Sequence, residues 1–448
     1  MCTMCRLPAK ARTTASAKPS DMHRSEDNSG RCVLFASYAP HLIYPIGYIY
    51  HDLDHLFSPA VPPVTPGARV AASIEILDDI LAGQAAEQAL TRWARNSRFA
   101  GSKDRAAVRD LVFAALRTWR SDAVLGGGAD GRARMIGRLR AEGADIDAHF
   151  DSAGHAPAPL AEEEQQAGAV PTETGDRWNL PEWLLPQWQA ALGDDAEAAA
   201  LLAQDRAPIT LRVNTRQCSV ADVQSALERE QVLTEPNALS PTALTVLSNP
   251  RRVRQSQAYT EGWIEMQDAA SQAVVDAIPD GVRALDYCAG GGGKALALAA
   301  RGFTVWAHDI APGRMADIPD RAERAAVQIR VVAPDQLPAK EKFDVVLCDA
   351  PCSGSGAWRR SPEGKWALTQ DRLDELNSVQ DEILDTAMAH LSANGTLVYV
   401  TCSVLTCENE DRIAAFLSRH QGWSCILEKR WPISEAGDGF FTAHLTRG

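Results

Sequence analysis

The chain has 448 residues, with 45 Lys and Arg against 58 Asp and Glu, so its formal net charge is −13. This length predicts roughly two to four domains. Hydrophobic residues make up 45% and charged residues 23% of the chain, which excludes a wholly disordered chain and a collagen-like one. The acidic balance argues against nucleic-acid binding by bulk positive charge, because phosphates require Lys and Arg to face them. A local basic surface is still compatible with this charge.

Residues 1–64 fit no domain pattern, and we expect an unassigned tail or a product of a wrongly chosen start codon. The Cys2-x-x-Cys5 pair and the HDLDH cluster at 51–55 resemble metal ligands, but neither has a supporting pattern, so we expect no metal. The uncharged segment 32–50 is interrupted by Pro, Gly and Tyr and is a poor membrane span. We therefore expect a cytoplasmic protein without membrane association, whose ten cysteines stay reduced.

Residues 65–150 are predicted to form a helical domain. Apolar residues follow helical spacing from 70 to 81 and from 108 to 119, and a further helix is expected over 132–150. The basic residues between the first two segments form either a solvated helix face or an RNA-facing patch; they are Arg92, Arg95, Arg98, Lys103, Arg105 and Arg109. Residues 151–175 are rich in Pro, Ala, Glu and Gln, which predicts a linker.

Residues 176–275 read as a small α+β module. The pattern predicts strands over 209–214 and 243–247, with a helix over 220–229 between them. Three arginines follow in one short loop, at 251, 252 and 254. They belong either to a solvated turn or to a contact with an RNA backbone.

Residues 276–448 alternate strands and helices, which predicts an α/β fold with a parallel sheet and helices on both faces. Strands are expected at 283–287, 304–308, 329–332, 343–348 and 396–401, and helices at 294–300 and 369–390. Four of these strands end at or near Asp309, Asp335, Asp349 and Cys402. The carboxyl ends of such strands form the edge where open α/β sheets bind their ligands.

A glycine run at 290–293 lies between the first of these strands and its helix. Glycine lets the backbone approach a ligand closely and reach positive φ. Gly290, Gly292 and Ala295 match the dinucleotide fingerprint, and Asp309 lies near the distance expected of a ribose-binding acid. These features alone support NAD and S-adenosylmethionine equally, because both carry an adenosine.

Two segments distinguish these cofactors: DAPCSGSG at 349–356 and TCSVLTCENE at 401–410. Each places a cysteine, Cys352 or Cys402, just beyond a strand. Hydride transfer needs no such thiols, whereas methylation of a pyrimidine ring carbon does. A thiolate that adds to carbon 6 makes carbon 5 nucleophilic, an acid at ring nitrogen 3 assists, and loss of the carbon 5 proton later expels the thiolate. The target base must also be splayed out of its stack.

From residue 66 to residue 448 the chain resembles the RNA cytosine-5 methyltransferases of the RsmB/Sun type. The resemblance is carried by CAGGGGK (288–294), MQDAASQ (266–272), DAPCSGSG (349–356), TCS (401–403), ENE (408–410) and GDGFF (437–441), together with the LPEW and LRVN segments. The two cysteine motifs in this order are highly specific, while the glycine motif alone is not. One departure is Gly291, where the family usually has proline.

The resemblance implies that Cys402 is the nucleophile, that Cys352 assists product release, and that Asp349 contacts the cytosine. It implies an S-adenosylmethionine site lined by Cys288, Ala289, Gly290, Gly291, Gly292, Gly293, Lys294, Asp309, Asp335 and Asp349. It further implies a Rossmann-like methyltransferase domain over 276–448 and a NusB-like RNA-binding domain over 65–150. The implied substrate is a cytidine of small-subunit ribosomal RNA, and we expect a monomer.

Two other functions remain open: another Rossmann enzyme, such as an NAD-dependent dehydrogenase, and a noncatalytic RNA-binding factor in ribosome assembly. Glycine in place of proline at 291 makes the free loop more flexible, so we expect weaker cofactor affinity. Given the acidic net charge, we expect RNA to be held locally, at Arg92–Arg109, Arg251–Arg254 and Arg359–Arg360.

Overall fold

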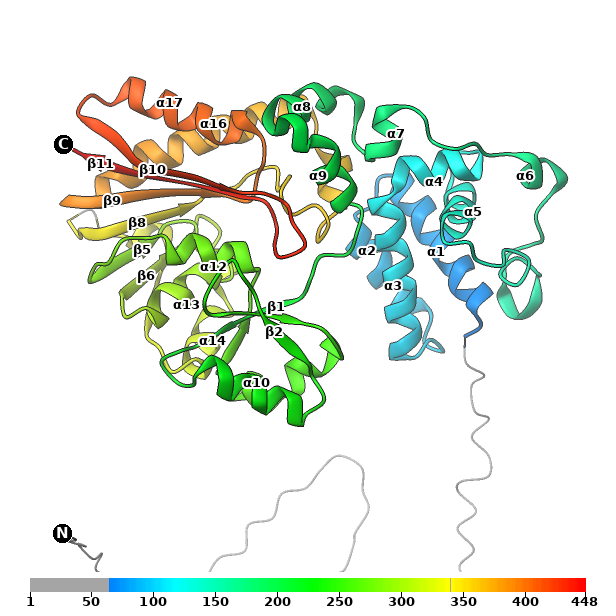
Figure 1. The fold of residues 1–448 in the computed structure, drawn as a ribbon, viewed down its shortest axis with the longest axis horizontal. Coiled ribbons are helices and arrows are strands. Elements are labelled where there is room, and N and C mark those ends of the chain that lie inside the picture. The colour runs from blue at the N-terminus through cyan, green and yellow to red at the C-terminus, as the bar shows by residue number, and fades with distance from the viewer. Residues whose placement is uncertain (1–63, 339) are drawn as a thin grey trace, which may run out of the picture. The chain divides into compact units, whose positions relative to one another are not determined.

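A computed structural model describes residues 64–338 and 340–448 (Figure 1). The Cys2–Cys5 pair, the HDLDH cluster and the uncharged segment 32–50 lie outside the described residues. Within the described part of the chain, no helix is long and apolar enough to cross a membrane. The same part holds no group of three or more His, Cys, Asp or Glu side chains that could bind a metal ion.

The first helical block consists of α1 (Pro66–Leu81), α2 (Ala86–Asn96), α3 (Ser102–Arg117), α4 (Trp119–Gly126) and α5 (Gly131–Ala141). The Thr65 side chain caps α1, and Gly127 ends α4 in the left-handed region, which glycine adopts without a steric penalty. Apolar side chains from α1, α3 and α5, including Ile76, Val112 and Met135, are fully buried in one core. The sequence pattern missed α2, whose charged residues obscure its apolar stripe.

The segment 151–175, expected to be a linker, is bound to this block. It contains η1 (Ala153–His155) and α6 (Glu162–Gln166) and runs into α7 (Thr174–Trp178). Arg132 of α5 pairs with Glu164 at 2.6 Å, and Arg140 donates to the carbonyl of Ala167 at 2.7 Å. The arginines of α5 therefore satisfy polar groups of a segment whose composition alone suggests a solvated chain.

The next helices are η2 (Glu182–Leu184), α8 (Leu185–Leu192), η3 (Gly193–Asp195) and α9 (Ala196–Leu202). They share a hydrophobic core with residues from the far end of the chain. Trp188 of α8 stacks on Trp358 with ring centroids 5.9 Å apart, and Leu373 and Val404 are buried in the same cluster. These helices thus pack against the loop after the first cysteine motif, against a later helix that carries Leu373, and against Val404 of the second motif.

The small module contains a four-stranded antiparallel sheet in the order β2-β3-β1-β4. Its elements are β1 (Thr210–Val213), α10 (Val220–Arg229), β2 (Thr234–Pro236), β3 (Ala243–Val246), η4 (Pro250–Gln255), α11 (Gln257–Thr260) and β4 (Ile264–Met266). The strands expected at 209–214 and 243–247 and the helix at 220–229 are confirmed. The pattern missed β2 and β4, which have three residues each and are too short to show alternation.

The large sheet has seven strands in the order β10-β11-β9-β8-β5-β6-β7 (Figure 1). Its elements are β5 (Arg283–Asp286), α13 (Gly293–Ala300), β6 (Thr304–His308), η5 (Pro312–Met315), α14 (Ile318–Arg324), β7 (Ile329–Val332), η6 (Pro334–Gln336), β8 (Phe343–Asp349), α15 (Glu363–Ala367), α16 (Gln370–Ala387), η7 (Met388–His390), β9 (Leu391–Thr401), η8 (Thr406–Glu408), α17 (Glu410–Arg419), β10 (Trp423–Trp431) and β11 (Phe440–Arg447). The preceding helix is α12 (Ala269–Asp276). The expected strands are confirmed, but the expectation of a wholly parallel sheet is wrong, because β11 runs antiparallel to both β9 and β10.

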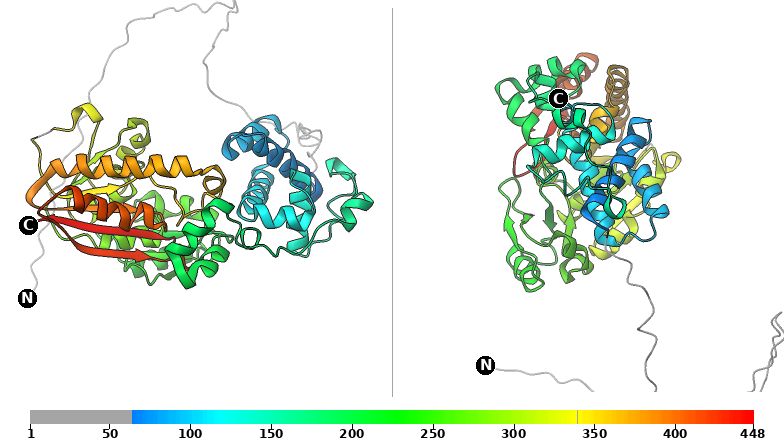
Figure 2. Two further views of the ribbon diagram at one scale, coloured as in Figure 1. Left: turned by 90° about the horizontal axis from the view of Figure 1, so that it is seen from above. Right: turned by 90° about the vertical axis from the view of Figure 1, so that its right-hand side faces the viewer.

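Helices cover both faces of this sheet, as expected. Side chains alternate between faces along a strand, so Val345 of β8 joins the core with α12 and α13, whereas Val346 joins the core with α16 and α17. The views in Figure 1 and Figure 2 show α16 lying along the sheet. These two layers hold the carboxyl ends of β5, β6, β8 and β9 at one edge of the sheet.

Candidate active site

The loop after β5 brings the backbone close to the next strand. Gly290 has φ +51° and Gly292 has φ +81°, the left-handed region that favours glycine. A Cβ atom on Gly292 would lie 2.7 Å from Cγ1 of Ile318, so a larger residue does not fit. The Gly290 amide donates to Oδ2 of Asp309 at 2.9 Å, which fixes the glycine loop to the end of β6.

A cavity of about 260 Å³ lies beside this loop. It is lined by Tyr287, Cys288, His308, Asp309, Ile310, Arg314, Pro351, Val379, Glu382, Ile383 and Thr386. The Ile310 side chain is 81% exposed, while Asp309 is only 1% exposed. Apolar walls next to a buried carboxylate suit an adenosine, whose base needs apolar contact and whose ribose hydroxyls need an acceptor.

Asp286, at the end of β5, is a site residue that the sequence interpretation missed. It is 1% exposed, and neither carboxylate oxygen has a hydrogen-bond partner among the described residues. Burial, followed by the charge of Asp349, raises the pKa of Asp286 to about 7. A buried carboxyl group without a partner points to a ligand, and a cationic group of the cofactor would favour its ionised form. Its place at a strand end before the glycine run was the signal that could have identified it.

Lys294 and Asp349 join the glycine loop to the first cysteine motif. The Lys294 Nζ atom lies 2.7 Å from Oδ2 of Asp349. Burial acts to lower the pKa of Lys294, but the charges of Asp349 and Cys402 outweigh it and raise the pKa. Lys294 is therefore a buried ammonium paired with Asp349.

The two predicted cysteines meet at this edge of the sheet. Their Sγ atoms lie 3.5 Å apart, although 50 residues separate them in the chain. The hydrogen bond to Cys402 and burial together raise the pKa of Cys352. Either thiol can be the donor in this contact, and the raised pKa of Cys352 favours its protonated form.

Glu408 ties the two cysteine loops together, a role that the sequence did not indicate. Its buried carboxylate accepts from the Ser353 amide at 2.7 Å, from the hydroxyls of Ser353 and Ser403, and from Gln380 at 3.1 Å. Ser353 and Ser403 are the residues that directly follow Cys352 and Cys402. By binding the residue next to each cysteine, the Glu408 carboxylate holds the two thiols at a fixed spacing.

Most predicted site residues gather at this edge, with Asp335 as an exception. Asp335 lies in η6, beyond the end of β7, where it is exposed and does not line the cavity. Cys288 does line the cavity, and burial raises the pKa of its thiol. The carbonyl of Gly291 accepts a hydrogen bond from Arg321, which the sequence did not predict.

The expectation that Arg359 contacts RNA is wrong. Arg359 is 2% exposed and donates to Asp438 at 2.7 Å, so its charge is used inside the protein. Arg360 also pairs with Asp438 and with Asp268. In the helical block, Arg92 pairs with Asp79. Some of the basic residues proposed from the sequence to contact RNA therefore form ion pairs within the protein.

Known protein families match two parts of this chain. Residues 274–446 match the family model of the 16S rRNA methyltransferase RsmB/F, and residues 180–254 match the ferredoxin-like domain of RsmF/B-like methyltransferases. The chain is 33% identical over 288 residues to ribosomal RNA small subunit methyltransferase B of Serratia proteamaculans, covering 60% of this chain and 67% of that protein. It is 35% identical to the protein of that name from Citrobacter koseri, with the same coverage.

A solved structure supports the fold. A methyltransferase homologue from Pyrococcus horikoshii matches with a TM-score of 0.53 and 22% identity, covering 61% of this chain and 97% of that one. The glycine loop, the adenosine-sized cavity and the buried acids fit S-adenosylmethionine, which is the cofactor. The chain belongs to the RsmB/F family of 16S rRNA methyltransferases.

Proposed function

We propose that this protein methylates carbon 5 of a cytidine in small-subunit ribosomal RNA through a covalent adduct between Cys402 and the base. The observation that carries the proposal is the 3.5 Å separation of the Cys352 and Cys402 Sγ atoms. A site with one nucleophilic thiol and one protonated thiol suits addition to a ring carbon followed by release. The relatives named as small subunit methyltransferases support the class of RNA.

Cys402 is the nucleophile in this proposal. The buried Lys294 ammonium stabilises its thiolate, and the sulfur adds to carbon 6 of the cytosine. Asp349, paired with Lys294 at 2.7 Å, passes a proton taken up from solvent to ring nitrogen 3, so the electron pair of the broken double bond becomes available at carbon 5. When bound, S-adenosylmethionine supplies an electrophilic methyl group on a positively charged sulfur. Carbon 5 would take up that methyl group as the bond between the methyl carbon and the sulfur breaks, and the sulfur would leave with the electron pair as a neutral thioether.

Cys352 assists release of the product. Loss of the carbon 5 proton returns its bonding electrons to the ring, re-forms the double bond and expels the Cys402 sulfur as a thiolate. Ring nitrogen 3 gives its proton back to Asp349. Cys352 donates its proton to the leaving sulfur, and the resulting Cys352 thiolate takes up the proton from carbon 5. Cys352 is then back in its starting state, and Cys402 is a thiol that returns to its starting thiolate by releasing one proton to solvent.

The cofactor-binding residues in this proposal are 288–294, Asp309 and Asp349, as the resemblance implies. Asp335, which the resemblance also implies, is left out because it is exposed and does not line the cavity, and Asp286 is added. We also propose residues 276–448 as the catalytic domain and residues 176–275 as its small α+β module. Residues 65–150 would be a NusB-like RNA-binding domain. In support, Arg95, Arg98 and Lys103 of that block are exposed and have no ion pair among the described residues.

The test is to incubate variants with ribosomal RNA and S-adenosylmethionine and to separate protein from RNA under denaturing conditions. Cys352→Ala should accumulate a covalent protein–RNA adduct, because addition proceeds while release is slowed. Cys402→Ala should form no adduct and no methylated base, while Cys425→Ala, a control on β10, should behave as wild type. An adduct with Cys402→Ala but none with Cys352→Ala would exchange the roles. Bisulfite sequencing of the RNA from a deletion strain would identify the cytidine.

A further inference from the structure

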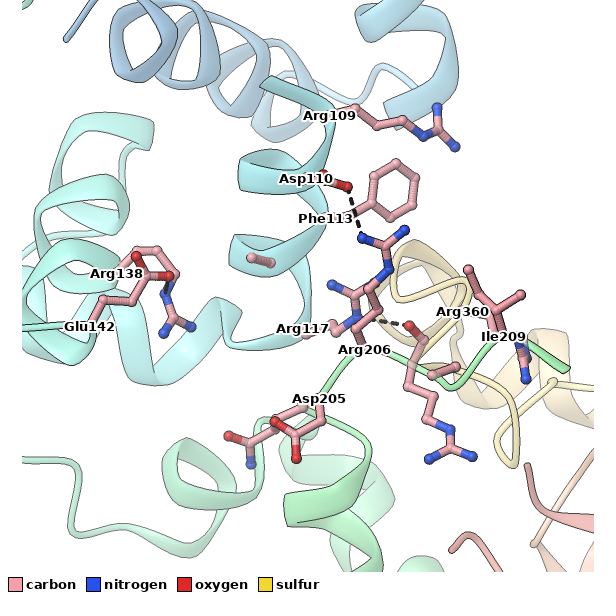
Figure 3. A pocket seen from close by; sticks show the side chains of 14 residues that line it. Arg109, Asp110, Phe113, Arg117, Arg138, Glu142, Asp205, Arg206, Ile209 and Arg360 are labelled. Atoms are coloured by element: carbon pink, nitrogen blue, oxygen red, sulfur yellow. Dashed lines mark hydrogen bonds and ion pairs between the residues drawn. The ribbon is translucent and has the colours of Figure 1, made fainter. Parts of the chain in front are cut away.

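A cleft of about 470 Å³ lies outside the cofactor site, where the helical block meets the catalytic region. Its walls come from α3, from the end of α5, from the connector before β1, and from the loop beyond the first cysteine motif (Figure 3). Its charged lining residues are Arg109, Arg117, Arg138, Arg206, Arg359 and Arg360, with Asp110, Glu142 and Asp205. Six arginines in one cleft are notable in a chain with a net charge of −13.

Several of these arginines are already neutralised by partners in the fold. Arg109 pairs with Glu87, and Arg138 lies 3.0 Å from Glu142. Arg359 and Arg360 share Asp438. These pairs shape the walls of the cleft. Arg117, which has no ion pair among the described residues, and Arg206, which pairs with Asp110 at 3.3 Å, supply the charge open to a ligand.

Arg117 has no carboxylate within salt-bridge distance among the described residues. Its Nε atom donates to the main-chain carbonyl of Arg359 at 2.7 Å, which leaves the rest of the guanidinium toward the cleft. Burial and the nearby charge of Arg206 lower the pKa of Arg117. An anion bound between the two guanidiniums would relieve this repulsion.

A bound anion would compete with the carboxylate of Asp110 for the same arginines. Its carboxylate lies 3.3 Å from Arg206 and 3.7 Å from Arg251 (the Arg206 contact is dashed in Figure 3). The side chains of Arg206 and Arg251 are 66% and 69% exposed, so solvent and ligands can reach both. The Asp110 carboxylate is therefore shared by two exposed arginines, while Arg117 nearby has no ion pair among the described residues.

We propose that this cleft binds phosphate groups of the RNA substrate, which displace Asp110 from Arg206 and Arg251 and complete the coordination of Arg117. This inference rests on the proposed function and adds a site for the RNA backbone to it. Planar guanidinium groups match phosphate oxygens through paired hydrogen bonds. Phe113 also lines the cleft, and the Arg109 guanidinium lies over its ring, 4.6 Å from the ring centre.

The cleft is joined to the catalytic loop by a short run of main chain. Arg359, whose carbonyl holds Arg117, follows Trp358, and the Trp358 indole donates to the Ser353 carbonyl at 3.1 Å. Ser353 is the neighbour of Cys352. RNA held on the helical block is thereby placed on the same loop that carries a catalytic thiol. An acidic protein would find the same charges, but RNA is favoured because the adjoining site acts on RNA.

The test compares equilibrium binding of a small-subunit ribosomal RNA fragment across a salt series. Arg206→Glu should weaken binding at least tenfold and reduce the slope of log affinity against log salt by about one. Asp110→Asn should tighten binding several-fold, since the competing carboxylate is lost. The matched control is Arg229→Glu, a charge reversal at an exposed position of α10, which should change binding less than twofold.

Opposite effects of the two variants are required. Equal binding by Asp110→Asn and wild type, or equal losses in Arg206→Glu and Arg229→Glu, would overturn the proposal. So would unchanged RNA binding together with weakened binding of a polyglutamate peptide by Arg206→Glu, which would assign the cleft to an acidic protein. Each variant is also tested for S-adenosylmethionine binding and for adduct formation in the Cys352→Ala background at saturating RNA. Normal adduct yield with weaker binding separates this site from the chemistry of the proposed function.

Discussion

The ammonium of Lys294 lies 2.7 Å from the carboxylate of Asp349, and together they join the cofactor loop to the first cysteine motif. The Lys294 side chain is 8% exposed and the Asp349 side chain 34%. Asp349 can thus face a bound base while Lys294 stays behind it. In the proposed mechanism, a charge-assisted contact of this kind orients the carboxyl group toward ring nitrogen 3 at little cost in reorganisation.

Replacing Lys294 with Met should remove this support. We expect methyl transfer to fall by about 100-fold, the order seen when one preorganised electrostatic contact is lost from an active site. Single-turnover methylation measures the effect, and Lys103→Met, at an exposed position of α3, is the control. Full activity of Lys294→Met would show that neither Asp349 nor the Cys402 thiolate depends on the ammonium.

Glu408→Gln should separate the two cysteine loops. The carboxylate is fully buried and accepts from donors on both loops, whereas an amide nitrogen presents hydrogens to some of those donors. Leaving buried donors unsatisfied costs about 1–3 kcal/mol of unfolding free energy. Urea denaturation should show that loss, together with a reduced adduct yield in the Cys352→Ala background. Glu428→Gln, at an exposed position of β10, should show neither, and the prediction fails if both substitutions behave alike.

Gly291→Pro should tighten binding of S-adenosylmethionine. Gly291 has no positive φ, and a Cβ atom there would lie 3.5 Å from Arg321, an ordinary contact. The substitution stiffens the free loop, and a gain of about 0.4–1 kcal/mol corresponds to roughly a two- to fivefold lower dissociation constant. Calorimetric titration measures it, and an unchanged or higher constant would contradict the entropic argument.

Arg321→Met should have the opposite effect on the cofactor. Arg321 donates to the Gly291 carbonyl and pairs with Glu265 at 2.9 Å, so it anchors the flexible loop to the small module. Arg324 is a close control because it also pairs with Glu265 but makes no described contact with the loop. Arg324→Met should leave the dissociation constant near that of wild type. Equal losses from both substitutions would assign the effect to Glu265 and the module instead.

Local sequence patterns correctly predicted many of the helices and strands. The strand over 304–308 and the helix over 220–229 match β6 and α10 residue for residue, because each has clear periodicity and distinct ends. The expected edge of acids and thiols also formed, since strand ends of a parallel sheet converge. The antiparallel β11 could not be identified in this way, because its buried run gives no alternation to separate strand from helix.

Interactions distant in sequence account for the remaining differences. Arg359 pairs with Asp438, 79 residues away in the chain. Because the sequence pattern around Arg359 does not show this distant partner, the positive charge of Arg359 was interpreted as an RNA contact. The role of Glu408 depends on donors from a loop 55 residues away. Asp286 differs, because its strand-end position was visible and only its lack of a partner required the structure.

We expect the buried Lys365 of α15, which contacts α3, to make the free energy of unfolding depend on pH. It is 1% exposed, donates to the Arg117 carbonyl at 3.3 Å, and lies 4.7 Å from the centre of the Trp366 ring. Burial, followed by the charge of Arg117, lowers the pKa of Lys365 to about 7. Between about pH 7 and pH 10 the unfolded chain holds a proton that the folded chain does not, so this group makes stability rise with pH in that window.

Lys365→Met should remove that contribution. Its gain in unfolding free energy over wild type should be greatest at pH 7 and below, where the buried ammonium is charged. The gain should shrink by up to about 1.4 kcal/mol for each pH unit above 7. Urea denaturation at pH 6, 7, 8 and 9 measures the difference in unfolding free energy. Lys103→Met is the control, and its difference from wild type should be the same at all four pH values. A difference that stays constant from pH 6 to pH 9 would mean that Lys365 remains charged in the folded protein throughout.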